Sequence, residues 1–326
     1  MDDVAAMRRA LELAASVRST AHPNPWVGAV LAAEGRWWEG ATEPPGGRHA
    51  EVVALDAAPT DLAGSTMYVT LEPCCAFEGK RTLPCAQLLI DRGVRRVVVA
   101  AEDPDQRVAG RGIAGLRAAG LAVEVGLLGD EALDLLHPYV HHRTTRRPFV
   151  VLKLAATLDG GTAAPDGTSQ WITGREARRD AHRLRADSDA VLVGAGTVRT
   201  DDPSLTVRLV DGPEPRRIVL GDAPADAAIH PCTELRGDLG EVLDRLGADD
   251  VVQLLVEGGA TVAGAFHRAG LVDRYVVYVA PALFGGDDGR GLFTGFGAPT
   301  IEDVWRGRIA DVARLGDDLR IDVVPS

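Results

Sequence analysis

The sequence predicts two α/β domains, and three observations support this fold class. The chain has 326 residues, 46% of them hydrophobic, which is enough for the cores of two domains of roughly 100–200 residues each. Short apolar runs typical of buried strands alternate with helical patterns in both halves. The segment 143–148, RTTRRP, is charged, lacks apolar side chains and ends in proline, so we place the domains at 1–145 and 146–326.

The first half begins with a helix and then alternates strands with helices. Val4, Met7, Leu11 and Ala14 follow helical spacing, which predicts an amphipathic helix at the start. Alternation of strand and helix predicts a sheet with helices on both faces. We predict short buried strands at 27–33, 66–71, 95–101 and 121–128, and helices at 50–58, 85–93, 112–120 and 131–142.

The second half restarts the same alternation, so it is predicted to be a second α/β domain. Its first strand, FVVLKLAA, follows the charged segment directly. We predict strands at 149–156, 189–196, 216–221, 251–259 and 273–283, and helices at 174–189, 238–247 and 261–270.

Composition favours a cytoplasmic enzyme that acts on a small molecule. A net charge of −12 and 5% aromatic residues argue against nucleic-acid binding, which needs a basic surface and stacking side chains. The N-terminal segment carries two acids and an interrupted apolar pattern, unlike a secretory signal, and no run is long enough for a membrane span. In a reducing compartment a disulfide among Cys74, Cys75 and Cys85 is the poorer interpretation.

Four residues of the first half have the pattern of a catalytic zinc site. His49 and Glu51 open a predicted helix after the turn PPGG, and Cys74 and Cys85 each follow a proline at a strand-to-helix turn. One imidazole and two thiolates fill three corners of a zinc tetrahedron and leave the fourth for water. Glu51, which is not a ligand, is placed to move protons. The order H-x-E, then P-C, then C is the signature of zinc deaminases.

Other assignments of the cysteines and histidines stay open beside this one. Cys75 is most simply a passenger, but as a fourth ligand it would make the zinc structural. A catalytic cysteine would need its own base, and the sequence shows none. We expect Cys232, His182 and His267 to be packed core residues, and His141 and His142 to lie at a solvated helix end.

The second half carries weaker signals of phosphate binding. In VEGGAT a buried strand ends at two glycines and a helix begins, which suits a phosphate group. GAGTVRTDDP begins with G-x-G only, so it is a weak dinucleotide fingerprint. Arg185 and Arg208 could bind a sugar phosphate through their guanidinium forks, although without the surrounding motifs solvated surface positions are the better explanation.

Motifs throughout the chain resemble the family of bifunctional riboflavin-biosynthesis deaminase–reductases. In the first half these are HPNPWVGAV, HAEVVAL, YVTLEPC, TLPC and DPDQRVAGRG. In the second half they are KLAATLDG, SQWITG, LRADSDAVLVGAGTVRTDDPSLTVR and VEGGATVAGAF. The two sets occur in the family's order and cover nearly the whole chain.

This resemblance implies a two-step enzyme. A cytidine-deaminase-like three-layer domain with Zn²⁺ would deaminate 2,5-diamino-6-ribosylamino-4(3H)-pyrimidinone 5′-phosphate. A dihydrofolate-reductase-like α/β domain would then reduce the ribosyl group to ribityl with NADPH, in a dimer or larger homo-oligomer. By resemblance, the substrate contacts are Asn24, Ser169, Arg185, Leu205, Arg208 and Glu257, and the cofactor contacts are Ala155, Trp171, Thr197, Asp201 and Gly259 to Ala265, including Ala260 and Thr261.

The chain departs from the family pattern at several positions. The family's loop reads close to PCSHHGRTPPC, whereas residues 73–85 read PCCAFEGKRTLPC, and Thr42 stands where many members have histidine. The altered loop, 75–83, makes a paralogue with changed or lost deaminase specificity the rival hypothesis. A nucleic-acid base deaminase is disfavoured by the acidic charge. Between Leu220 and Val251 the chain is short and one peripheral strand is expected to be missing, and Asp222 keeps NADH open as an alternative cofactor.

Overall fold

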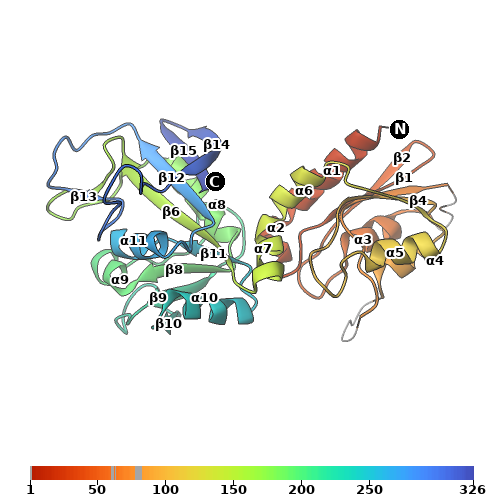
Figure 1. Ribbon diagram of the computed structural model, residues 1–326, viewed down its shortest axis with the longest axis horizontal. Helices are drawn as coiled ribbons and strands as arrows, with labels where there is room; N and C mark the ends of the chain where they lie inside the picture. Colours follow the sequence, from red (N-terminus) through yellow and green to blue (C-terminus); the bar gives the residue numbers. More distant parts are fainter. Residues whose placement is uncertain (1, 60–61, 63, 78–82) are drawn as a thin grey trace. The chain divides into compact units, whose positions relative to one another are not determined.

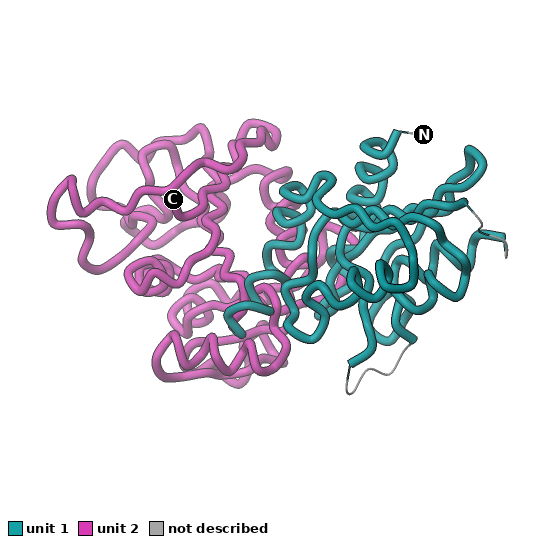
Figure 2. The backbone as a smooth tube through the Cα atoms, turned by 45° about the vertical axis from the view of Figure 1, so that its right-hand side comes forward, with its two compact units in different colours: residues 1–146 teal, residues 147–326 magenta. Residues whose placement is uncertain are grey.

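The chain divides into two compact units, Met1–Arg146 and Arg147–Ser326 (Figure 2). The computed structural model describes residues 2–59, 62, 64–77 and 83–326. Each unit is built on its own sheet (Figure 1), so the predicted α/β fold class is confirmed. No helix in the described residues combines the length and hydropathy that a membrane span requires.

The first unit is a five-stranded mixed sheet between two layers of helices (Figure 1). The strand order is β2-β1-β3-β4-β5, with β1 antiparallel to both neighbours and the last three strands parallel. Helices α1 and α6 contact one face, and α3 packs on β1 and β2. The strands are β1 (Gly28–Ala33), β2 (Arg36–Ala41), β3 (Thr66–Leu71), β4 (Arg96–Ala101) and β5 (Ala122–Val125), and the helices are α1 (Asp3–Ser16), α2 (Arg18–Ala21), α3 (Ala50–Ala57), α4 (Cys85–Asp91), α5 (Arg111–Ala118), α6 (Gly129–Leu135) and α7 (His137–Thr145).

The antiparallel β1 decides which segments meet at the functional end of this sheet. Because β1 runs opposite to β2 and β3, its first residues lie at the same end as the last residues of those strands. The loops after β2, β3 and β4 and the turn before β1 therefore gather at one end. The candidate metal ligands come from these loops.

Several predictions for the first unit were wrong in detail. Strand β2 was not predicted, since RWWEGA mixes charged, aromatic and small residues and half of them are exposed. Strand β5 was expected to be buried, but it forms the edge of the sheet and is largely exposed. The helix expected at 131–142 is two helices, and α7 continues to Thr145, into the segment expected to be a linker. His142 is 2% exposed, because it lies on the buried face of α7 with Pro138 and Tyr139, and is not at a solvated end.

The second unit is an eight-stranded sheet with helices on both faces (Figure 1). Its order is β10-β9-β8-β11-β6-β12-β15-β14, parallel from β10 to β12 and antiparallel thereafter. The elements are β6 (Phe149–Thr157), β7 (Gly161–Ala163), α8 (Arg175–Ala186), β8 (Ala190–Gly194), α9 (Ala195–Asp201), β9 (Arg216–Leu220), β10 (Thr233–Leu235), α10 (Leu239–Ala248), β11 (Gln253–Val256), α11 (Ala260–Arg268), β12 (Arg274–Ala280), β13 (Arg290–Gly291), β14 (Gly307–Leu315) and β15 (Asp318–Pro325).

Alternate residues of the central strands face two separate cores. Phe149 and Val151 of β6 pack with side chains of α8 and α9, whereas Val150 and Leu152 pack with side chains of α10 and α11. Continuous apolar runs such as FVVLKLAA are what a parallel strand buried on both faces requires. This is why these strands were predicted correctly.

The peripheral strands of this sheet were predicted less well. A strand was expected to be missing between Leu220 and Val251, but the short strand β10 lies there and pairs in parallel with β9. It escaped prediction because it has three residues, two of them exposed. The hairpin of β14 and β15 was also not predicted, since β14 is exposed along most of its length and lacks a regular apolar alternation.

Candidate active sites

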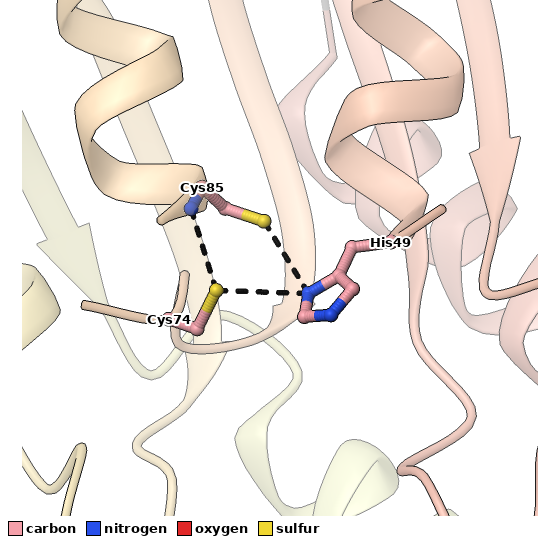
Figure 3. A group of neighbouring side chains, drawn as sticks. All are labelled: His49, Cys74 and Cys85. Atoms are coloured by element: carbon pink, nitrogen blue, oxygen red, sulfur yellow. Dashed lines mark hydrogen bonds between the residues drawn. The ribbon is translucent and has the colours of Figure 1, made fainter. Parts of the chain in front are cut away.

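A compact group of potential metal ligands lies at the functional end of the first sheet (Figure 3). His49 precedes α3, Cys74 lies in the loop after β3, and Cys85 is the first residue of α4. Their ligand atoms all lie within 4.8 Å of one another. His49 Nδ1 is 3.6 Å from the Cys74 sulfur and 3.4 Å from the Cys85 sulfur. The structure thus brings together the three residues that the sequence singles out as ligands.

Local backbone geometry explains this convergence. His49 is the N-cap of α3, and Gly40 of β2 lets that helix lie directly on the sheet. A Cβ at Gly40 would be 2.0 Å from the carbonyl oxygen of Ala50, so any larger residue would displace the start of the helix. Cys85 opens α4, and its backbone N–H donates to the Cys74 sulfur at 3.3 Å. The two helix starts therefore hold the imidazole and the two sulfurs in place.

The chemistry of the three donors suits zinc. Two sulfurs and one imidazole are ordinary zinc ligands, and three protein ligands leave a tetrahedral position for water. Hydrogen bonding by Cys85 and His49 lowers the pKa of the Cys74 thiol to about 3, although burial opposes this shift. The thiolate is the form that binds a metal. The residues present therefore fit a catalytic zinc ion.

Glu51 lies beside this group in the first turn of α3. Its side chain is buried, with 3% of the residue exposed. Burial raises the pKa of the Glu51 carboxyl to about 7, and the negative charge of Cys74 contributes in the same direction. A carboxyl group that gains and loses a proton near neutral pH is suited to general acid–base catalysis.

Cys75 makes a different contact from its neighbour Cys74. Its thiol donates to the carbonyl oxygen of Arg107 at 3.5 Å, in the loop after β4. The guanidinium of Arg107 lies 4.9 Å from the centre of the Phe77 ring. The start of the altered loop 75–83 is therefore packed on the loop after β4, while its residues 78–82 lie outside the described residues.

Glu72 is a buried residue at this end of the sheet that sequence reasoning missed. Its carboxylate accepts hydrogen bonds from three backbone N–H groups of the segment 103–113, at 3.2, 2.9 and 3.1 Å. Gly112 lies against the chain at Pro73, since a Cβ there would be 2.0 Å from the Pro73 carbonyl oxygen. Glu72 thus ties α5 and its preceding loop to the segment that leads into Cys74. The sequence signal that could have identified Glu72 is its position directly after the apolar strand TMYVTL.

Asn24 and Thr42 lie at the same end of this sheet. Asn24 is half-buried in the turn between α2 and β1. The N–H of Gly28, at the start of β1, donates to Thr70 Oγ1 near the end of β3 at 3.1 Å. Thr42 is buried, and its hydroxyl accepts from the N–H of Val27 at 3.0 Å. Thr42 therefore fixes the chain that leads from Asn24 into β1.

A cavity of about 300 Å³ lies beside α8 in the second unit. It is strongly cationic, which suits an anionic group such as a phosphate. Trp171 at its rim is 63% exposed and lies under the Arg178 guanidinium, which is 4.7 Å from the ring. The cavity is lined by Lys153, Trp171, Arg175, Arg178, Ala181, His182, Arg185, Arg208 and Leu209.

Arg185 forms a buried ion pair with Glu257 at this cavity. Its Nε and Nη2 donate to the two carboxylate oxygens at 2.5 and 3.0 Å, and its Nη1 donates to the Thr206 carbonyl at 3.0 Å. Burial alone would raise the pKa of Glu257, but the Arg185 charge lowers it below its ordinary value. Three of the five N–H groups of Arg185 are thus used within the protein, which leaves two for a ligand.

Lys153 was missed as a site residue, although it stands out as the one charge within the apolar strand FVVLKLAA. Its Nζ is 3.9 Å from a Glu257 oxygen, and its side chain lines the cavity. Burial lowers the pKa of Lys153, while the Glu257 charge opposes that shift. A desolvated ammonium at a substrate-sized cavity is a candidate proton donor.

Arg208 and His182 line the cavity together. The backbone N–H of Arg208 donates to His182 Nδ1 at 3.1 Å, and the Arg208 guanidinium donates to Ser204 and Thr206 hydroxyls at 3.2 Å each. Burial and the charges of Arg185 and Arg208 lower the pKa of His182 to about 4. His182 is therefore neutral at pH 7 and accepts the backbone hydrogen bond.

Two other predicted substrate contacts flank this region. Ser169 lies in the half-buried loop before α8. Leu205 is buried and has φ of 51°, a left-handed conformation that is costly for leucine. Unfavourable backbone conformations are concentrated at ligand-binding and active sites, and this one lies next to Thr206 and Arg208.

Four of the predicted cofactor contacts, Thr197, Gly259, Ala260 and Thr261, lie at the starts of α9 and α11. Thr197 Oγ1 in α9 accepts from the N–H of Gly259, the N-cap of α11, at 3.1 Å. Ala260 and Thr261 form the first turn of α11, whose free N–H groups suit a phosphate. Asp201 ends α9, and burial raises its pKa. Ala155, another predicted contact, is two residues from Lys153 on β6 and so faces the same side of the sheet.

Asp222 forms an ion pair with Arg236 just beyond the ends of β9 and β10. Both side chains are about two-thirds exposed, at 66% and 67%. The positive charge of Arg236 therefore offsets the negative charge of Asp222, which could otherwise repel a bound phosphate group.

Comparison with protein families matches both units. The model described as "Cytidine and deoxycytidylate deaminase zinc-binding region" matches residues 1–101, and that described as "RibD C-terminal domain" matches residues 148–320. Riboflavin biosynthesis protein RibD of Mycobacterium tuberculosis is 42% identical, and the alignment covers 98% of this chain and 96% of that protein. The RibD protein of Escherichia coli is 38% identical, and the alignment covers 99% of this chain and 100% of that protein.

Two solved structures are similar to this chain over nearly its whole length. RibD of Acinetobacter baumannii superposes with a TM-score of 0.93 at 35% identity and covers 99% of both chains. A diaminohydroxyphosphoribosylaminopyrimidine deaminase/5-amino-6-(5-phosphoribosylamino)uracil reductase of Thermotoga maritima superposes with a TM-score of 0.90 at 33% identity, again over 99% of both chains.

Proposed function

Because the chain belongs to the RibD family of bifunctional riboflavin-biosynthesis enzymes, we propose that each of its units carries one of the two active sites. The enzyme deaminates 2,5-diamino-6-ribosylamino-4(3H)-pyrimidinone 5′-phosphate and reduces the ribosyl chain of the product to ribityl. We assign deamination to residues 1–145 and reduction to residues 146–326. This assignment rests on where the two groups of side chains lie: His49, Cys74 and Cys85 are together in the first unit, and the cationic cavity is in the second unit.

In the deaminase, His49, Cys74 and Cys85 would hold Zn²⁺, which supplies a hydroxide at neutral pH when bound. Glu51 takes up the proton released at this position and delivers it to the amine that leaves the pyrimidine ring. The Glu51 carboxyl is placed for both steps because it is buried in the first turn of α3, directly beside the ligand His49. Asn24, at the same end of the sheet, would bind the substrate.

In the reductase, the cavity residues would bind the ribosyl phosphate. Arg208 and the two unused N–H groups of Arg185 offer charged donors to the phosphate, together with Ser169 and Leu205 as neighbouring contacts. Glu257 orients Arg185 and Lys153 by pairing with both. Lys153 Nζ is placed to supply the proton that accompanies the hydride to the opened sugar.

The cofactor would lie along the starts of α9 and α11 and supply the hydride. Gly259, Ala260 and Thr261 would face its phosphates, while Thr197 holds the backbone N–H of Gly259 and Asp201, at the end of α9, would be a further contact. Ala155 and Trp171 complete the set of contacts. NADPH is preferred to NADH, because Arg236 pairs with Asp222 and so offsets the negative charge with which Asp222 would repel a 2′-phosphate.

We also propose a homo-oligomer, a dimer or a tetramer, in the cytoplasm. Strand β14 forms an edge of the eight-stranded sheet, and it exposes 59% of Ile309 and 53% of Val312. Exposed apolar side chains on an edge strand are suited to pairing with a second copy. Cys74 and Cys85 must stay reduced to bind a metal, as they would in the cytoplasm. Sedimentation velocity of the full chain measures its oligomeric state and so tests whether it is a dimer or a tetramer.

Incubation of the chain with the diaminopyrimidine ribosyl phosphate tests the proposed function. Metal-free and zinc-loaded protein are compared, each with NADPH or NADH, and products are followed by mass spectrometry. We expect deamination only with zinc, and complete conversion to the ribityl product with zinc and NADPH. Absence of both deamination and reduction by zinc-loaded protein would refute the proposal. Faster reduction with NADH would overturn the cofactor assignment alone.

A further inference from the structure

Four polar side chains form a largely buried network behind the cationic cavity. Asp180 of α8 accepts a hydrogen bond from the hydroxyl of Tyr278 at 2.7 Å and from Nη1 of Arg320 at 2.8 Å, both on its Oδ2. Arg320 also donates through Nε and Nη2 to Asp322 at 2.7 and 2.9 Å. Asp180, Tyr278 and Asp322 are 7%, 1% and 4% exposed, and the Arg320 side chain is 20% exposed, so the contacts are largely shielded from water. They join α8 to strands β12 and β15.

Helix α8 carries the cavity wall on a different face from Asp180. Arg175, Arg178, His182 and Arg185 line the cavity, and their spacing of three or four residues places them on one face of the helix. Asp180 lies outside this pattern and points to the sheet, where Tyr278 and Arg320 meet it. The hydrogen bonds at Asp180 therefore determine how the cavity face of α8 is turned and how far it lies from the sheet.

Strand β15 also fixes the beginning of α8. The carboxylate of Asp318, which is 3% exposed, accepts from the N–H of Gly174, the N-cap of α8, at 2.7 Å. Asp318 and Arg320 are two residues apart on the strand, so they face the same side of the sheet. The C-terminal strand thus holds α8 at its start and at its middle.

Tyr278 connects this network to Lys153. In the parallel pair of β6 and β12, Tyr278 is opposite Ala155 and Val276 is opposite Lys153, which puts Tyr278 and Lys153 on one face of the sheet. Lys153 Nζ is 5.9 Å from the centre of the Tyr278 ring. The hydroxyl of Tyr278 therefore holds α8 while its ring borders the ammonium that pairs with Glu257.

We infer that Tyr278, Asp180 and Arg320 are positioning residues for the reductase, which set the distance between the cation-bearing face of α8 and Lys153. This inference rests on the proposed reductase function of the second unit. None of the three belongs to the cavity lining, so they act through Lys153 and the α8 cations. Loss of the network should misplace bound substrate, and a displacement of about 1 Å can lower a rate roughly 100-fold.

The test compares Tyr278→Phe with the matched control Tyr275→Phe. Both tyrosines lie on β12, both are buried, and each has a hydroxyl with one side-chain partner, which for Tyr275 is His267 at 2.8 Å. Their rings pack in the two different cores of the sheet. Kinetic constants for reduction of the deaminated intermediate are measured well below the melting temperature of each variant, with zinc-dependent deamination by the same protein as an internal control.

For Tyr278→Phe we expect KM for the intermediate to rise and kcat to fall, lowering kcat/KM roughly tenfold or more, with deamination unchanged. Tyr275→Phe should keep wild-type kcat and KM. Asp180→Asn provides a second variant and should lower kcat/KM in the same way. Kinetic constants of Tyr278→Phe equal to those of Tyr275→Phe, with only a lower melting temperature, would show a purely structural role and overturn the inference.

A binding measurement separates this inference from the proposed function. Ribose 5-phosphate is titrated calorimetrically into wild-type protein and both tyrosine variants. Weaker binding to Tyr278→Phe alone supports the positioning role even where the wild-type protein fails to reduce the intermediate, which would refute only the proposed reaction. Equal binding to all three proteins contradicts a role of Tyr278 in placing the α8 cations.

Discussion

At the scale of single residues, Glu51 and Glu72 show how surroundings assign different roles to two buried glutamates. Glu51 lies beside the side chains of His49 and Cys85. Burial raises the pKa of the Glu51 carboxyl to about 7, so this group is suited to move protons. Glu72 accepts three backbone hydrogen bonds from the segment 103–113, so it is suited to hold the chain. Residue type alone does not distinguish these roles, whereas the partners of each carboxyl group do.

Cys75 and Cys85 offer a residue-scale test of the metal site. Cys75→Ser should leave one zinc ion per chain, because the Cys75 thiol contacts the Arg107 carbonyl and lies outside the group of potential ligands. Cys85→Ser should lose most of its zinc, because it removes one of three ligands. Zinc content is measured by atomic emission after dialysis. Zinc loss from Cys75→Ser would make Cys75 a fourth ligand and the site structural.

At the scale of elements, helix starts carry much of the proposed chemistry. His49 caps α3, Cys85 opens α4, and Gly259 caps α11. These starts could be predicted because each follows a buried apolar strand or a glycine-rich turn, and glycine or proline lies within two residues before it in the sequence. Strands β2, β10 and β14 could not, since they are short or exposed and their side chains satisfy no regular apolar pattern.

Helix α1 is attached to the first sheet by a hydrogen-bonded carboxylate. Asp3 accepts from Arg96 at 2.6 and 3.1 Å and from the Tyr68 hydroxyl at 2.6 Å, and Arg96 in turn pairs with Glu124. Hydrogen bonds from Arg96 and Tyr68 lower the pKa of Asp3 to about 2. This attachment links the helix to β3, β4 and β5 at once.

The Asp3 contacts should make part of the stability of the first unit depend on pH. An unfolded aspartate has a pKa of about 3.9. Because the folded pKa is lower, the stabilisation is complete above pH of about 4 and is lost as pH falls toward 2. Asp3→Asn should destabilise by about 1 kcal/mol at pH 7, since the pair is partly exposed.

Calorimetry of the full chain between pH 3 and 7 checks this expectation. The gap in melting temperature between wild type and Asp3→Asn should narrow as pH falls. Asp134→Asn, which changes an exposed carboxylate on α6 of the same unit, serves as control. A gap for Asp3→Asn that stays constant down to pH 3 would contradict the proposed role of the carboxylate.

At the scale of the whole molecule, both sites combine residues that are far apart in the sequence. The metal ligands were predictable because residue type and order carry the signal, with His49 and Cys85 at helix starts and Cys74 shortly after the end of a strand. The cationic cavity was less predictable, because Lys153 comes from β6 and the other cations from α8 and the chain near Arg208. The network of Tyr278, Asp180 and Arg320 had no signal at all, since it depends on the position of the C-terminal hairpin.

The central claim is that one chain holds two separate active sites, and a pair of variants tests it most directly. Glu51→Gln and Lys153→Met are each incubated with the diaminopyrimidine ribosyl phosphate, zinc and NADPH, and products are identified by mass spectrometry. We expect Glu51→Gln to leave the starting compound unchanged but to reduce supplied deaminated intermediate at the wild-type rate. Lys153→Met should deaminate normally and accumulate the unreduced intermediate. Deamination by Glu51→Gln at the wild-type rate, or loss of deamination in Lys153→Met, would contradict the account.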